Sequence, residues 1–288
     1  MEISFYKYHG LGNDYLVYDS CKNNTQLTKE AIKKICHRNF GLGSDGILVG
    51  PLMAGNTIGV KIFNPDGSEA EKSGNGVRIF AKYLKDAGYV TAESFTLYTL
   101  GGEVSIRYNN EMGTNMTVFM GKLSFDREVI GCVHTPKETI DIPLEFYKKV
   151  YQCTCVSIGN PHCVIPMEEI SRELVCEIGK YSERAEYFPD RINTQIVKVM
   201  DRQNIQIEIF ERGAGYTLAS GSSSCAAAGA VYRLGLVGKC VCVHMPGGQL
   251  QIEIDKDYNV SMTGEVASIG KMTLSKEFIF ENMEIKLT

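Results

Sequence analysis

Residues 63–84, FNPDGSEAEKSGNGVRIFAKYL, recur in plan at residues 210–234, FERGAGYTLASGSSSCAAAGAVYRL. Each stretch begins with phenylalanine, passes through polar, glycine-rich chain to a Ser-Gly pair, and continues into a helix-like run. Ser220 lies 147 residues after Ser73, and the two phenylalanines have the same separation. One constant separation near half the chain length indicates two copies of one supersecondary unit, because a solenoid needs three or more repeats.

The two Ser-Gly pairs predict a type of chemistry. Each pair is expected to open a helix, whose first amides have no intrahelical partner and whose dipole attracts anions. Two related halves that face each other would place a carboxylate between the two helix starts. A side chain from each half could then approach one carbon from opposite sides, removing a proton on one face and returning a proton on the other. The same separation of 147 residues links the Gly-Asn turns at Asn13 and Asn160.

Length and composition favour a water-soluble enzyme over a nucleic-acid or membrane protein. The 288 residues suit one large domain or two of about 140 residues each. Hydrophobic residues make up 44% and charged residues 22%, and the net charge of −4 gives no sign of a nucleic-acid surface. No apolar run is long enough to span a membrane, and no signal peptide is visible at the N-terminus. We therefore expect a cytoplasmic protein.

The ten cysteines are interpreted as reduced core residues. Cys153 and Cys155 alternate along the chain, as do Cys240 and Cys242, which is typical of strand residues that point in one direction. There is no C-x-x-C motif, no cluster with metal-ligand spacing, and no lysine in a recognisable pyridoxal-phosphate setting. No metal and no organic cofactor is therefore expected.

The pattern along the chain predicts strands, one central helix, strands, and then the same series again. Helices are expected at 28–37, at 77–84 with Gly88 as a stop, and at 226–234 with Gly235 as a stop. The predicted strands are 3–8, 15–18, 47–49, 60–63, 95–97, 104–108, 116–120, 150–158, 192–199, 205–210, 241–244, 250–254, 260–263 and 278–287. We expect an α+β fold of two pseudo-symmetric domains, each a curved sheet around its helix. The N-terminal domain would comprise 1–125, completed by a last strand at 276–288, and the C-terminal domain 126–275.

Several polar residues lie close to the glycine turns and could line a pocket. They are Asn13, Asn64, Gly74, Asn75, Asn160 and Asn193. Glu211 and Arg212 stand where Asn64 stands in the first copy, so they either form a surface ion pair or hold an ammonium and a carboxylate. His162 follows Gly-Asn-Pro in the second copy, and it is either a core residue or an acid–base group.

The motifs KYHGLGND, FNPDGSEAEKSGNGVR, GNPH and ERGAGYTLASG resemble the diaminopimelate epimerase family, whose members work without pyridoxal phosphate. They occur in order over nearly the whole chain. The resemblance implies barrel-like sheets around the two central helices, with the active site in the cleft between the domains. It also implies interconversion of LL- and meso-diaminopimelate in lysine and peptidoglycan synthesis, an amino-acid substrate, and a homodimer.

The resemblance also assigns roles to residues. It places substrate contacts at Asn13, Asn64, Gly74, Asn75, Asn160, Asn193, Glu211, Arg212, Gly221 and Ser222. It places His162 and Glu211 where the family tunes its acid–base pair. Arg212, with Asn160 and Asn193, resembles the set that holds the distal carboxylate.

The main departure lies at the catalytic pair. Where the family has two cysteines, one thiolate base and one thiol acid, this chain has Ser73 and Ser220. A thiol titrates near pH 8.5, whereas a serine hydroxyl stays neutral at pH 7 unless a partner base takes its proton. Gly46 and Tyr216 also depart from the family, which commonly has glutamine and glutamate there.

Three interpretations remain open at this stage. The chain is an epimerase that works with serines, at a weakened or altered rate. Alternatively it is a Cys-to-Ser variant made to trap ligand, or a divergent member that acts on another amino acid or only binds one. The retained substrate-holding set favours the first interpretation.

Overall fold

The computed structural model describes residues 2–55, 57–71 and 73–282, and the chain divides into two compact units. Unit 1 comprises Met1–Val118 and Glu265–Thr288, and unit 2 comprises Phe119–Gly264. The limits predicted from the sequence, at 125/126 and 275/276, lie several residues further along the chain than the limits of these units. Unit 2 is thus inserted into unit 1.

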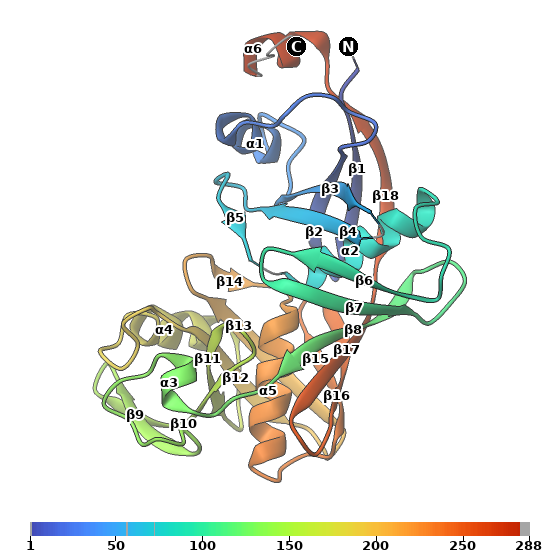
Figure 1. Cartoon of the computed structure of the whole chain (residues 1–288). Coiled ribbons are helices and arrows are strands. Elements are labelled where there is room, and N and C mark those ends of the chain that lie inside the picture. Colours follow the sequence, from blue (N-terminus) through green and yellow to red (C-terminus); the bar gives the residue numbers. More distant parts are fainter. Residues whose placement is uncertain (1, 56, 72, 283–288) are drawn as a thin grey trace. The chain divides into compact units, whose positions relative to one another are not determined.

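Unit 1 is a mixed sheet with helices on both faces (Figure 1). Its strands are β1 (Ser4–Gly10), β2 (Asn13–Asp19), β3 (Ile47–Ala54), β4 (Thr57–Phe63), β5 (Glu69–Ala70), β6 (Ser94–Thr99), β7 (Gly102–Tyr108), β8 (Asn115–Lys122) and β18 (Ala267–Thr273). Its helices are α1 (Lys29–Cys36), α2 (Gly74–Asp86) and α6 (Lys276–Asn282). The strands pair in the order β18–β1–β2–β3–β4–β6–β7–β8, with β2/β3 and β4/β6 parallel and the other pairs antiparallel.

Unit 2 repeats this order. Its strands are β9 (Ile142–Phe146), β10 (Lys149–Ser157), β11 (Pro161–Pro166), β12 (Asn193–Val199), β13 (Asn204–Glu211), β14 (Gly215–Thr217), β15 (Cys240–Met245), β16 (Gly248–Ile254) and β17 (Asn259–Glu265), and its helices are α3 (Arg127–Ile130), α4 (Arg172–Ser182) and α5 (Gly221–Arg233). The strands pair in the order β9–β10–β11–β12–β13–β15–β16–β17, with β11/β12 and β13/β15 parallel. The repeat read from the sequence is therefore present as a shared strand order, strand direction and helix position.

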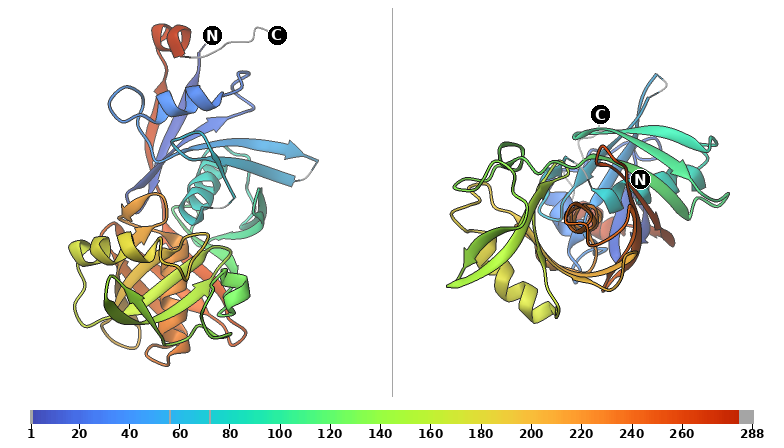
Figure 2. Two further views of the ribbon diagram at one scale, coloured as in Figure 1. Left: turned by 90° about the vertical axis from the view of Figure 1, so that its left-hand side faces the viewer. Right: turned by 90° about the horizontal axis from the view of Figure 1, so that it is seen from below.

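In each unit the sheet separates a central helix from a second helix. The side chains of β10, β11 and β12 alternate between the two faces, as strand geometry requires. Cys155, Cys163 and Ile196 belong to the core that packs on α4, whereas His162 and Gln195 lie on the α5 side. Helix α5 contacts β10, β11, β12, β13, β15 and β16, and the right-hand view of Figure 2 shows it end-on with strands of unit 2 around it.

Small residues let the strands of unit 2 approach α5 closely. Ala226, Ala227, Ala228 and Ala230 are all fully buried. A Cβ added at Gly229 would lie 2.3 Å from Leu123 Cδ1, so the helix has no room for a larger side chain there. Such close packing holds the N-terminus of α5 in a defined place in its unit.

The predicted last strand at 278–287 is wrong over the described residues, because α6 occupies Lys276–Asn282; residues 283–287 lie outside them. Ser275 caps the helix by accepting a hydrogen bond from the Phe278 amide at 3.1 Å, and Ile279 and Phe278 pack on the α1 side of unit 1. The strand that returns to unit 1 is instead β18, which pairs with β1.

Two further helices escaped the sequence analysis, and one began earlier than predicted. Helix α4 has an N-cap signal in Ser171, whose hydroxyl accepts from the Leu174 amide, and α3 is only one turn long. Helix α5 begins at Gly221 rather than 226, because Ser220 caps it. Within the described residues, no helix is both long and apolar enough to cross a bilayer.

Candidate active site

In unit 1, Ser73 is the residue that opens helix α2. Its backbone is extended, with φ −138° and ψ 119°, and its hydroxyl accepts a hydrogen bond from the Gly76 amide at 3.1 Å. This is N-cap geometry, which satisfies one of the unpaired amides of the first turn. The hydroxyl is therefore held at the positive end of a 13-residue helix.

A second group reaches the same hydroxyl. The phenol oxygen of Tyr15, on β2, lies 3.3 Å from Ser73 Oγ, and either atom can be the donor. Gly46 makes room for the tyrosine ring, because a Cβ at that position would lie 2.6 Å from Tyr15 Cε1 and 2.4 Å from the Phe63 carbonyl oxygen. The glycine that departs from the family pattern is thus coupled sterically to Tyr15.

Asn13 and Asn75 form the next layer at the start of α2. Asn75 Nδ2 donates to Asn13 Oδ1 at 3.1 Å, and Asn13 Nδ2 donates to Asp45 Oδ2 at 2.8 Å. The guanidinium of Arg78 is fully buried beneath them, and it donates to Asn75 Oδ1 at 2.6 Å and to the Gly74 carbonyl at 3.2 Å. The first turn of α2 therefore carries a full positive charge in addition to its dipole.

Asn64 occupies the preceding turn and is bonded to that turn. Its Nδ2 donates to Ser68 Oγ at 3.0 Å, and its backbone amide donates to the Ser68 carbonyl. The side chain is half-buried. These bonds shape the turn that follows β4.

In unit 2, Ser220 opens α5 in the same way. Its φ of −147° and ψ of 127° match those of Ser73, and its hydroxyl accepts from the Ser223 amide at 3.4 Å. Ser222 Oγ lies 3.5 Å from the same oxygen. Ser220 and Gly221 are buried. The Ser-Gly pairs predicted to open helices do so in both units.

The surroundings of Ser220 differ from those of Ser73. Asn160 Nδ2 donates to Ser222 Oγ at 3.4 Å, and its Oδ1 lies 3.0 Å from His162 Nε2. His162 Nδ1 lies 3.3 Å from Gln195 Oε1, and Gln195 Nε2 donates to Ser223 Oγ at 3.1 Å. His162 thus connects to Ser220 through the side chains of Asn160 and Ser222.

The electrostatics of His162 follow from its burial. The ring is fully buried, and desolvation lowers its pKa to about 3, with a further lowering from the charge of Arg212 that outweighs the hydrogen bond to Gln195. The imidazole is therefore neutral at pH 7. A neutral ring that lacks direct contact with Ser220 can orient its neighbours.

Asn193 and Arg212 lie together at the adjoining edge of unit 2. Asn193 Nδ2 donates to the Pro161 carbonyl at 2.9 Å, and its Oδ1 accepts from the Arg212 backbone amide at 3.0 Å. The Arg212 guanidinium donates to the Asp190 carbonyl at 3.0 Å. Glu211 is the last residue of β13, directly before Arg212, and is half-buried.

The structure therefore brings the predicted residues together in two sets. Unit 1 gathers Asn13, Ser73, Gly74 and Asn75, and unit 2 gathers Asn160, His162, Asn193, Glu211, Arg212, Ser220, Gly221 and Ser222. The sequence analysis missed Tyr15, Arg78, Gln195 and Ser223. Tyr15 could have been found, because it stands 147 residues before His162.

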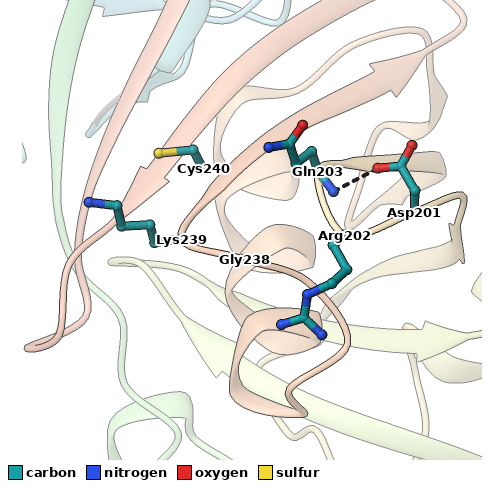
Figure 3. Close-up of a pocket in the computed structure, with 6 residues that line it drawn as sticks. All are labelled: Asp201, Arg202, Gln203, Gly238, Lys239 and Cys240. Atoms are coloured by element: carbon teal, nitrogen blue, oxygen red, sulfur yellow. Dashed lines mark hydrogen bonds between the residues drawn. The ribbon is translucent and has the colours of Figure 1, made fainter.

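A surface pocket of about 680 Å³ lies elsewhere in unit 2 (Figure 3). Asp201, Arg202 and Gln203 line it from the turn before β13, and Gly238, Lys239 and Cys240 line it from the loop before β15. This loop follows the C-terminal end of α5, which is about 20 Å from Ser220 for a helix of this length. The pocket is thus separate from the helix starts.

Comparison with protein families gives one match across both units. The model named "Diaminopimelate epimerase" matches residues 5–125 and 154–269. A relative from Nostoc sp. strain PCC 7120, named "Diaminopimelate epimerase 2", is 48% identical over 276 residues, which cover 96% of each chain. A diaminopimelate epimerase of Moorella thermoacetica is 36% identical over 269 residues, covering 92% of this chain and 96% of the relative.

Solved structures share the fold at much lower identity. A hydroxyproline epimerase from Agrobacterium vitis with bound trans-4-OH-L-proline has a TM-score of 0.69 at 13% identity, covering 95% of this chain and 92% of that one. A phenazine biosynthesis PhzF-family protein from Bacillus anthracis has a TM-score of 0.66 at 16% identity, covering 96% and 99%. The mixed α/β fold is therefore common to these groups of proteins.

Proposed function

Because this chain belongs to the diaminopimelate epimerase family of isomerases, we propose that it interconverts LL- and meso-diaminopimelate with serine hydroxyls in place of the family's thiols. The observation that carries the proposal is that Ser73 and Ser220 cap equivalent helices in the two units with the same backbone geometry. Each hydroxyl is thus held beside helix-start amides, where charge that develops on a substrate carboxylate would be stabilised.

The proposed substrate contacts divide between the units. The starts of α2 and α5 would bind the α-carboxylate through the amides of Gly74, Asn75, Gly221 and Ser222. Arg212, with Asn160 and Asn193, would hold the distal carboxylate, since a guanidinium is the strongest side-chain donor for that group. Glu211 and Asn64 would receive the ammonium.

A serine needs help to accept a proton, and Tyr15 supplies a group of suitable kind beside Ser73. A phenol titrates near pH 10, well below an aliphatic hydroxyl. In the proposed step the α-proton moves to Ser73 Oγ while the Ser73 proton moves to the phenolate oxygen of Tyr15, 3.3 Å away. The electron pair of the C–H bond stays on the substrate, and the reverse step restores both groups.

In unit 2 the same role falls to Ser220 as proton donor on the other face of the α-carbon. Its proton would go to the substrate, and Ser222 and the Ser223 amide would stabilise the oxygen left behind. His162 and Glu211 would position this group and its substrate. That both serines reach one α-carbon in a shared cleft stays a prediction, and a crystal structure with bound diaminopimelate tests it.

The test is proton exchange. The purified protein is incubated with LL-diaminopimelate in D2O, and loss of the α-proton signal is followed by NMR together with the appearance of the meso isomer. Exchange with isomerisation supports the proposal, and its absence at concentrations that saturate binding contradicts it.

The weak acidity of serine favours one second candidate, a protein that binds an amino acid with little or no turnover. A Cys-to-Ser variant that traps ligand and a member that acts on another amino acid belong to the same test. Tight binding of diaminopimelate without exchange indicates the first two, and exchange of a different amino acid indicates the third. Sedimentation would show whether the protein forms the predicted homodimer.

A further inference from the structure

Behind Ser220, side chains and one backbone amide form a closed ring of hydrogen bonds. The ring runs from Ser220 through Ser222, Asn160, His162, Gln195 and Ser223, whose amide donates back to Ser220. His162, Gln195 and Ser223 are fully buried, so water does not complete their bonding. The donors and acceptors of the ring must therefore match one another.

The donor count requires one amide to turn its NH₂ group toward the imidazole. As drawn, the side-chain oxygens of both Asn160 and Gln195 face His162, and each oxygen needs an N–H from the ring. The buried imidazole is neutral and has a single N–H. Amide oxygen and nitrogen are assigned by such bonding arguments.

The contact distances indicate which amide turns. Asn160 Oδ1 lies 3.0 Å from Nε2, the usual length for an N–H donor, whereas Gln195 lies 3.3 Å from Nδ1. The shorter contact is the one that contains the hydrogen, because two facing lone pairs repel. The Ser223 hydroxyl can serve either orientation, since it both donates and accepts.

We propose that Gln195 is a positioning residue for the proposed epimerisation: its NH₂ group donates to His162 Nδ1 and so places the proton of His162 on Nε2. Ser223 then donates its hydroxyl proton to Gln195 Oε1. The inference rests on the proposed function for its catalytic consequence, and on the hydrogen-bond geometry alone for the tautomer.

The tautomer sets the direction of the whole ring. With the proton on Nε2, His162 donates to Asn160 Oδ1, Asn160 donates to Ser222 Oγ, and Ser222 donates to Ser220 Oγ. Ser220 then accepts two hydrogen bonds, and its own proton stays outside the ring, available for the substrate. With the proton on Nδ1 the order reverses, and Ser220 donates its proton to Ser222.

The test reads the tautomer directly. Protein labelled with ¹⁵N-histidine is studied without substrate by ¹⁵N–¹H correlation NMR, with His162→Gln identifying the signal. The Nε2–H form is expected in the unaltered protein. In Gln195→Glu, a carboxylate only accepts, so the proton is expected on Nδ1, and α-proton exchange should fall about 10- to 100-fold.

The controls separate position from fold. Gln206→Glu alters an exposed glutamine on the neighbouring strand β13 and should change neither the tautomer nor the rate. The proposal is overturned if the unaltered protein has Nδ1–H or both protons, or if Gln195→Glu leaves the tautomer as it was. Should Gln195→Glu not fold, Gln195→Met tests the rate, and the tautomer of the unaltered protein decides. Nε2–H without any exchange of diaminopimelate keeps the tautomer assignment and rejects the proposed function.

Discussion

The two helix starts have the same backbone and different polar surroundings. Asn13 bonds Asn75 in unit 1, and the equivalent Asn160 bonds Ser222 in unit 2. Tyr15 reaches Ser73 directly, whereas His162, its counterpart 147 residues later, is turned toward Asn160 and Gln195. Duplication therefore conserved the capped serine and allowed the group behind it to change.

Two further positions explain the difference. Gln195 replaces the apolar Leu48 at the equivalent place on its strand, so only unit 2 offers the ring at position 162 a polar partner. Arg78 is replaced by Cys225, so the α2 start has a buried cation and the α5 start does not. Unit 1 is thus suited to stabilising an anion, and unit 2 to orienting a neutral proton donor.

The largest expected effect comes from replacing both hydroxyls with thiols. In Ser73→Cys/Ser220→Cys, a thiol at each helix start can ionise near neutral pH, and α-proton exchange should rise about 10²- to 10⁴-fold. Exchange in D2O measures it. Ser171→Cys, at the N-cap of α4, is the matched control and should leave the rate unchanged. No rise in the double variant would show that the hydroxyls do not limit the reaction.

Tyr15→Phe tests the asymmetry at its shortest contact. Removing the phenol oxygen leaves Ser73 without the proposed proton acceptor, so kcat should fall about 100-fold while the KM changes little. Tyr18→Phe on the same strand is the control, because its hydroxyl bonds only the Thr25 carbonyl among the described residues. Equal rates for the two variants would contradict a role for Tyr15 in proton transfer.

The pH dependence of stability should depend on His162 and not on its counterpart. Its pKa is lowered from 6.5 to about 3, so between these values the unfolded chain binds a proton that the folded chain does not. Stability is therefore greatest above pH 6.5 and falls as the pH falls, by about 1.4 kcal/mol per unit, or about 2 kcal/mol at pH 5.

Urea unfolding at pH 7 and pH 5 measures this effect. His162→Phe should flatten the dependence, whereas His134→Gln, at an exposed position, should retain it. A dependence that survives in His162→Phe would assign the acid sensitivity to other groups, among them Asp14. Burial opposes ionisation of Asp14, but hydrogen bonds from Arg38 and Lys7 hold its pKa below the usual value.

The smallest effect is that of capping itself. Ser73→Ala and Ser220→Ala should each cost about 1 kcal/mol of stability, and Ser73→Ala slightly more, because its bond to the Gly76 amide is 3.1 Å against 3.4 Å for the equivalent bond. Ser171→Ala gives the reference value for a third helix. A loss of several kcal/mol in either variant would show that the hydroxyl supports more than its helix end.

The sequence was sufficient for features that local chemistry determines. A serine before glycine caps a helix wherever a helix follows, and glycine at 88 and 235 adopts the left-handed conformation after α2 and α5. The constant separation of 147 residues predicted the shared topology, because both copies must bury the same faces.

Features that depend on tertiary context were not predictable from pattern alone. Phe278 and Ile279 suit a strand or a helix, and the choice was made by the Ser275 cap and by packing on unit 1. Gln195 looked like an ordinary strand residue, and only its burial on the α5 side reveals a partner in His162. Glu211 and Arg212 were predicted from position, and their roles stay predictions.

The pairing of β1 with β18 has a consequence for biosynthesis. Residues 119–264 can complete their own sheet as soon as they leave the ribosome, whereas β1 has to wait for a partner that is made last. At about 5–20 residues per second, that delay lasts tens of seconds or less, during which one edge of β1 is open to other chains. Translation therefore reverses the usual order, and the half that contains the start codon is the last to mature.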